Sequence, residues 1–152
     1  NGKLLAWIEI QTDKQGGITT YQDIYLGDTD YTKKPIQITV NRKKGHFNNN
    51  GISWSPDNNQ FAFLSDAEQP GQQQLYIYNV KTSSTRKITT VKWLMSSPKW
   101  SPDGNNVAVL FTENLLENSG PSAAQTSHSS VNKDSYYEQR HAIVNISSGK
   151  LR

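Results

Sequence analysis

A serine in a stretch of small residues is the first candidate for chemistry in this sequence. Residues 120–124 read Gly-Pro-Ser-Ala-Ala, which loosely matches the Gly-x-Ser-x-Gly motif that presents a nucleophilic serine on a sharp turn. That motif needs an apolar strand before the serine and a helix after it, and neither pattern flanks Ser122. We therefore assign no nucleophile and no catalytic residue to this chain.

Metal binding and acid–base catalysis need histidines or carboxylates at defined spacings. No His-x-Glu or His-x-x-x-His pattern joins the three histidines, which are His46, His128 and His141. The sequence has no cysteine, which excludes disulfides, thiolate ligands and a cysteine nucleophile. Four carboxylates form no recognisable acid–base pair: Asp66, Glu68, Glu113 and Glu117. We predict no metal site, no cofactor and no Gly-rich phosphate loop.

Charge and apolar patterning exclude further classes of function. Lys and Arg number 16 and Asp and Glu 13, so the net charge of +3 is too small to indicate nucleic-acid binding. The densest basic cluster, at 42–44, is typical of a solvated loop. The longest apolar runs, 4–8 and 107–111, have five residues each, whereas a bilayer span needs about 20. We expect no nucleic-acid partner and no membrane span.

A repeated tetrapeptide indicates how the chain is organised. Trp-Ser-Pro-Asp occurs at 54–57 and again at 100–103, and 100 minus 54 gives a period of 46. A period of about 40 to 50 residues is typical of the four-stranded blades of a β-propeller. The structural repeat motif comprises Trp54, Ser55, Pro56, Asp57, Trp100, Ser101, Pro102, Asp103 and Gly104.

The register of the repeat extends beyond this motif. Ala62 and Ala108 occupy the same place in the apolar runs that follow the two motifs, and Ala6 aligns with Ala62 at an offset of 56. A second block, rich in β-branched and aromatic residues, predicts strands at 23–26, 75–80 and 142–146. A third block occurs at 35–39 and 86–89, and we expect it to recur just past Arg152. No helical periodicity persists, so the sequence predicts an all-β fold.

These blocks predict one propeller domain over residues 1–152, with about two to three four-stranded antiparallel blades in an incomplete ring. We expect a partial blade at about 1–40, a complete blade at about 41–90 and a partial blade at about 91–152. The third blade contains a long insertion at about 113–137, because Asn79 aligns with Asn145 at an offset of 66 instead of 46. We expect a polar surface loop there, or a loop that reaches a partner domain or the mouth of a channel.

The residues of the motif suit a hairpin turn. Proline favours the second position of the turn, aspartate can accept a hydrogen bond from the backbone two residues on, and glycine tolerates a positive φ. Asn58 stands where Gly104 stands, and asparagine is among the residues that best tolerate that conformation. We expect Trp54 and Trp100 to fill the gaps between adjacent blades rather than to stack on a ligand.

The order of these blocks resembles the propeller repeats of TolB-like proteins and of the prolyl oligopeptidase family of serine peptidases, above all its acylaminoacyl-peptidase and dipeptidyl-peptidase branches. Two stretches favour the peptidases. Ala-Trp-Ile-Glu at 6–9 is followed by a polar loop and the strand at 21–26, and Phe-Ala-Phe-Leu-Ser-Asp at 61–66 is followed by Gln-Leu-Tyr at 74–76. The resemblance covers nearly the whole chain.

The resemblance to the peptidases implies a separate α/β-hydrolase domain in the same parent chain, with a Ser, Asp and His triad outside this sequence. In that family the propeller covers the active site and admits short or unfolded peptides. This chain would then be a propeller segment that gates the active site, with peptide substrates as partners.

Two alternatives remain from other classes. A TolB-like protein would be a non-enzymatic periplasmic propeller that binds a segment of another protein. A propeller-type polysaccharide lyase would use a metal and histidines near the propeller axis, and the low histidine content disfavours it.

One complete and two partial blades cannot close a ring of about 4 to 8 blades. We therefore expect either a fragment of a larger propeller or self-association of copies through open strand edges. The chain begins with Asn1 rather than Met, so we expect the natural N-terminus to be missing. The parent is expected to be bacterial, and either periplasmic or secreted, or cytoplasmic.

Overall fold

The computed structural model describes residues 2–12, 20–38, 47–113 and 139–152. These residues form strands and turns, and none of them lies in a helix that could cross a membrane. The strands are β1 (Leu4–Thr12), β2 (Thr20–Asp28), β3 (Ile36–Ile38), β4 (Asn49–Trp54), β5 (Gln60–Ser65), β6 (Gln74–Asn79), β7 (Ser84–Lys87), β8 (Trp93–Trp100), β9 (Asn106–Glu113) and β10 (Gln139–Asn145). The insertion expected at 113–137 falls almost entirely on 114–138, outside the described residues.

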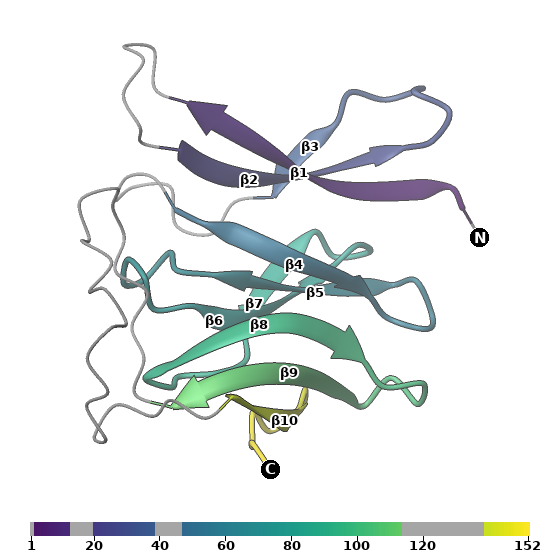
Figure 1. Cartoon of the computed structure of the whole chain (residues 1–152). Helices are drawn as coiled ribbons and strands as arrows, with labels where there is room; N and C mark the ends of the chain where they lie inside the picture. The colour runs from purple at the N-terminus through teal and green to yellow at the C-terminus, as the bar shows by residue number, and fades with distance from the viewer. Residues whose placement is uncertain (1, 13–19, 39–46, 114–138) are drawn as a thin grey trace.

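The strands form three antiparallel sheets, each made of strands consecutive in the chain. The middle sheet has four strands in the order β4-β5-β6-β7, and the outer sheets have the orders β1-β2-β3 and β10-β9-β8. Figure 1 shows the three sheets stacked on one another, with the β4–β5 and β8–β9 turns on the same side of the stack. This arrangement confirms the predicted all-β fold of an incomplete propeller.

The last residues of the chain pair with the outer edge of β10. The backbone N–H of Ile143 donates to the carbonyl of Arg152 at 2.8 Å, and the N–H of Arg152 donates back to Ile143 at 3.0 Å. An antiparallel bridge also joins Val144 to Leu151. A fourth strand of the third sheet therefore starts at Leu151. The repeat predicts the corresponding block just past Arg152.

Both faces of the middle sheet are covered, which explains why β5 and β6 read as almost continuous apolar runs rather than as alternating ones. Phe61 and Phe63 of β5 face the first sheet, whereas Ala62 and Leu64 face the third. The core between the first and middle sheets comprises Ile24, Leu26, Ile38, Phe61, Phe63, Tyr76 and Tyr78. The core between the middle and third sheets comprises Ala62, Leu64, Leu75, Ile77, Met95, Val107, Val109, Ala142 and Val144.

The first strands of the middle and third sheets carry matching bulges. The register shifts between Asn50 and Ser53 in β4 and between Ser96 and Lys99 in β8. Gly51 has φ +68° and Ser97, one repeat period later, has φ +53°. A bulge bends its strand and increases the local twist, so both first strands curve at the same point of the blade.

Candidate functional site at the paired Ser-Pro-Asp turns

The turn between β4 and β5 is closed by the side chains of Ser55 and Asp57. The Ser55 hydroxyl donates to the Asp57 carboxylate at 2.6 Å and accepts from the backbone N–H of Gln60 at 3.0 Å. Asp57 also accepts from the backbone N–H of Asn59 at 3.1 Å, two residues on, as the turn chemistry predicts. Serine and aspartate are needed at this spacing because together they satisfy the N–H groups that the turn leaves without strand partners.

The turn between β8 and β9 repeats this geometry. The Ser101 hydroxyl donates to the Asp103 carboxylate, and it accepts from the N–H of Asn106 at 3.0 Å. Asp103 accepts from the N–H of Asn105 at 3.0 Å. The position after each aspartate has a positive φ, +57° at Asn58 and +72° at Gly104, which is why asparagine or glycine stands there.

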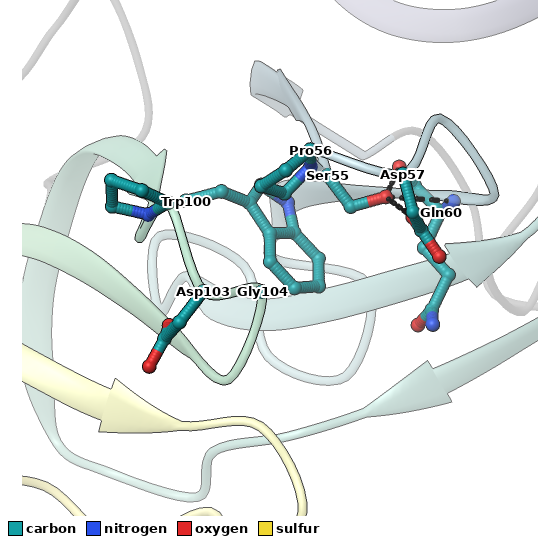
Figure 2. Close-up of a pocket in the computed structure, with 8 residues that line it drawn as sticks. Ser55, Pro56, Asp57, Gln60, Trp100, Asp103 and Gly104 are labelled. Atoms are coloured by element: carbon teal, nitrogen blue, oxygen red, sulfur yellow. Dashed lines mark hydrogen bonds between the residues drawn. The ribbon is translucent and has the colours of Figure 1, made fainter.

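The two turns line a shallow, open hollow of about 400 Å³ (Figure 2). Its floor is the indole of Trp100, which is half-buried and packs against the core between the middle and third sheets. Trp54, one blade earlier, packs against the core between the first and middle sheets. Its ring meets the Phe61 ring edge-on, with the ring centroids 5.2 Å apart. Gly2, Leu4, Trp54 and Asn58 line a second hollow there, of about 230 Å³. Each tryptophan thus lies between two sheets.

The electrostatics of the turns argue against catalysis. Hydrogen bonds from Ser55 and then Asn59 lower the pKa of Asp57 to about 2, and equivalent bonds from Ser101 and Asn105 lower the pKa of Asp103 below its ordinary value. A carboxylate whose pKa is lowered by hydrogen bonds is a weaker base, so neither aspartate is tuned to take a proton from the neighbouring serine. Ser55 is also buried, with 5% of its surface exposed. The described residues of the hollow therefore form no activated nucleophile–base pair.

The other candidates from the sequence lie apart from the turns. His141 is exposed on β10, and Glu68 forms an ion pair with Lys87 at the surface of the middle sheet. His46, His128, Ser122 and Glu117 fall outside the described residues. Among the residues that the structure describes, no group of three His, Asp or Glu side chains is placed to hold a metal ion.

Asp66 has a structural role that the sequence reasoning missed. The residue is 2% exposed, and its carboxylate accepts from the backbone N–H of Asn48 at 2.7 Å and of Gly71 at 3.0 Å. It therefore joins the start of β4 to the connection between β5 and β6. The Ser-Asp pair at the end of the apolar run could have indicated this, because aspartate there can bond to backbone beyond a strand end.

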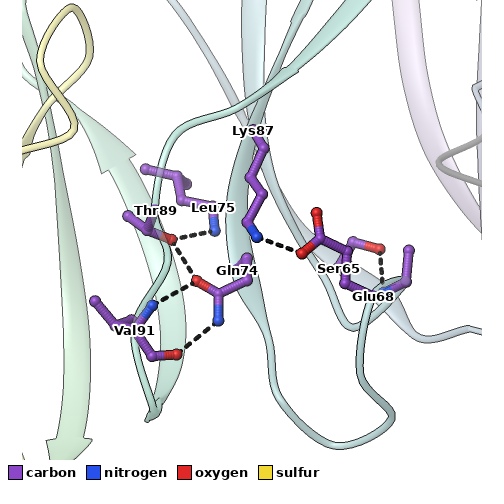
Figure 3. A network of polar contacts seen from close by, with 8 residues as sticks. Ser65, Glu68, Gln74, Leu75, Lys87, Thr89 and Val91 are labelled. Carbon is purple, nitrogen blue, oxygen red and sulfur yellow. Dashed lines mark hydrogen bonds and ion pairs between the residues drawn. The ribbon is translucent and has the colours of Figure 1, made fainter.

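Gln74 is a second position that the sequence reasoning missed, and it fixes the segment after β7 (Figure 3). Its amide oxygen accepts from the Thr89 hydroxyl at 2.9 Å and from the N–H of Val91 at 3.1 Å, and its amide nitrogen donates to the Val91 carbonyl at 2.7 Å. Thr89 in turn accepts from the N–H of Leu75 at 2.9 Å. The Gln-Leu-Tyr and Ile-Thr blocks of the repeat are thus hydrogen-bonded to each other.

Two curated proteins share short segments of sequence with this chain. A segment of 56 residues is 43% identical to the uncharacterized peptidase YuxL of Bacillus subtilis and covers 37% of this chain and 8% of that protein. A segment of 60 residues is 33% identical to the Tol-Pal system protein TolB of Alcanivorax borkumensis and covers 40% of this chain and 14% of that protein. No family model matches the sequence.

Several solved structures resemble nearly the whole described fold. A putative TolB from Agrobacterium tumefaciens has a TM-score of 0.60 at 20% identity, covering 97% of this chain and 44% of its own. An acylaminoacyl peptidase from Pyrococcus horikoshii has a TM-score of 0.65 at 12% identity, covering 99% of this chain and 23% of its own. The chain thus spans less than half the length of these proteins.

The comparisons confirm the resemblance that the repeat indicates. The solved structures show that the chain has the propeller fold of TolB and of these peptidases, and the curated matches are again a peptidase and a TolB.

Proposed function

We propose that this chain is a propeller segment of a prolyl oligopeptidase-like serine peptidase, of the dipeptidyl-peptidase or acylaminoacyl-peptidase type. The observation that carries the proposal is the 43% identity with a peptidase over 56 residues. The likeness in fold to an acylaminoacyl peptidase supports it.

The proposal gives the segment a gating role and no chemistry of its own. An α/β-hydrolase domain of the same parent chain would perform acyl transfer with an activated serine. The propeller would cover that active site and admit peptides by size. The hydrogen bonds that close the turns at Asp57 and Asp103 would suit this role, because a filter needs loops held in one conformation.

A TolB-like, non-enzymatic propeller that binds another protein is the alternative. The 33% identity with a TolB over 60 residues and the likeness to a second TolB favour it. In that case the hollow between the two turns would lie on a surface that contacts a partner.

Labelling with a fluorophosphonate serine probe separates these two functions. The native parent protein is treated with the probe, and its intact mass is measured, with heat-denatured parent as the control. The peptidase proposal predicts a single adduct on the native protein and none on the denatured one. A folded parent that takes up no probe would contradict the peptidase proposal and favour the binding propeller.

A further inference from the structure

The hollow between the two Ser-Pro-Asp turns combines an aromatic floor with two carboxylates. The Trp100 indole, Asp57 and Asp103 line it, and no Lys, Arg or His is among the described residues of its lining. Figure 2 shows the six-membered ring of Trp100 in the space between the two turns. The middle and third sheets both frame this hollow, so a further blade of a larger propeller would pack elsewhere, on the outer faces of the stack.

Both carboxylates are exposed and carry a negative charge. Hydrogen bonds from Ser55 and then Asn59 lower the pKa of Asp57 to about 2, and the pKa of Asp103 is lowered in the same way. An ionised carboxylate can accept about four hydrogen bonds, and each of these two accepts three within its own turn. Each can therefore still accept a hydrogen bond from a ligand in the hollow.

A flat cation fits both features of this hollow. The face of a tryptophan ring attracts a cation within about 6 Å of its centroid, most often arginine. A guanidinium group is planar, so it can stack on the ring and still donate hydrogen bonds to a carboxylate at its edge. The Trp100 ring packs against the core and also lines the hollow, so its structural role does not exclude such a contact.

The second hollow, one blade earlier, has the aromatic ring without the charge. Its described lining consists of Gly2, Leu4, Trp54 and Asn58, and none of these four residues is acidic. A cation would therefore meet an indole there but no carboxylate. The two hollows provide a comparison within one chain, in which we expect a cation to bind at Trp100 and not at Trp54.

We propose that the hollow at Trp100 binds the arginine side chain of a peptide, with the guanidinium group over the indole and hydrogen-bonded to the carboxylate of Asp57 or Asp103. The charge of the hollow and its aromatic floor together favour this ligand over a neutral or an acidic one. The inference goes beyond the proposed function and does not depend on it, because a peptidase and a binding propeller would both meet peptides.

An NMR titration of the isotope-labelled 152-residue chain tests the proposal. The probe is acetyl-arginine methylamide, and the control ligand is acetyl-citrulline methylamide, which has nearly the same shape and no charge. The arginine probe should shift the indole N–H signal of Trp100 and the backbone N–H signals of Asn59 and Asn105, and it should leave the indole signal of Trp54 in place. The citrulline ligand should bind about threefold more weakly, or weaker still.

Removal of the two charges tests the role of the carboxylates. The double variant Asp57→Asn, Asp103→Asn should weaken binding of the arginine probe by about fivefold. Asp30→Asn is the matched control, because it removes the same charge from an exposed position between β2 and β3, and it should leave binding unchanged. If the double variant does not fold, the comparison of arginine with citrulline on the wild-type chain decides. Equal shifts with both ligands, or shifts at Trp54 as large as at Trp100, would overturn the proposal.

A second measurement distinguishes a separate peptide from a segment of the parent chain as the source of the arginine. Saturation-transfer NMR of the arginine probe is recorded with the native parent protein and with its single variant Asp103→Asn. A weaker signal with the variant shows that the hollow is open to a peptide in the native parent. Equal signals would overturn the proposal, since the hollow would then be covered or filled by the parent chain itself.

Discussion

Asp57 shows how one exposed side chain stabilises a turn through its ionised form. Its carboxylate accepts hydrogen bonds from Ser55 and from the backbone and side chain of Asn59. These bonds exist in the folded chain and favour the charged form, so they lower the pKa from 3.8 to about 2. A group with a depressed folded-state pKa stabilises the fold above its unfolded pKa and loses that effect as the pH falls.

We therefore predict that the free energy of unfolding falls as the pH is lowered from about 4 to about 2. In Asp57→Asn the decrease over this range should be smaller, because the residue no longer titrates. Urea unfolding at a series of pH values measures the effect. Asp30→Asn, in the loop between β2 and β3, is the control, and an equal change in both variants would contradict the assignment to the turn.

Gly51 lies at a position that disfavours any side chain, because of its backbone conformation and, above all, its contact with the next sheet. Its φ is +68°, and an added Cβ would lie 2.6 Å from Cδ of Pro98 in the next sheet. Gly51→Ala should lower the free energy of unfolding by about 2 to 4 kcal/mol, from the left-handed backbone and the overlap together. Ser97→Gly at the equivalent bulge should change it by less than about 0.5 kcal/mol, since relief of strain offsets the added freedom of the unfolded chain. Denaturant unfolding checks both values.

At the scale of the element, Gln74 connects β6 to the segment that leaves β7. The side chain is 5% exposed and makes three hydrogen bonds, one with Thr89 and two with Val91. Gln74→Ala leaves the buried Thr89 and the half-buried Val91 without these partners and should cost about 2 to 4 kcal/mol of stability. Gln69→Ala is the control, because Gln69 is exposed in the β5–β6 connection. A change in Gln74→Ala no larger than in the control would show that water replaces the amide.

The sequence predicts features that depend on neighbouring residues. Ser55 and Asp57 lie two residues apart and close their turn locally, so the tetrapeptide alone predicts the hairpin. Gln74 and Thr89 lie 15 residues apart, and only the pairing of β6 with β7 brings them together. The bulges in β4 and β8 could not be predicted from the sequence, for another reason. Gly51 and the equivalent Ser97 share no residue type that would indicate a bulge, and the close contact of Gly51 with Pro98 joins residues 47 positions apart.

On the scale of the whole molecule, the buried apolar side chains lie between neighbouring sheets. The middle sheet has aromatic residues toward the first sheet and aliphatic residues toward the third, and both sets are buried. Removal of either neighbour exposes one core face to water, at about 25 cal/mol per Å² of apolar surface.

We predict that residues 47–91, which contain the complete middle sheet, do not fold alone. The segment has four paired strands, but its apolar residues lie on both faces, and a chain this short seldom forms a sufficient core by itself. Far-UV circular dichroism and amide NMR dispersion of the isolated segment, beside the whole chain, measure this. Residues 47–152 serve as the control, since the third sheet covers the face of Leu64 and Ile77, and this longer segment should recover part of the β signal. Cooperative unfolding of the isolated segment would contradict this prediction. It would mean that hydrogen bonding within the middle sheet is sufficient for folding, and that packing between sheets determines only how the sheets are arranged.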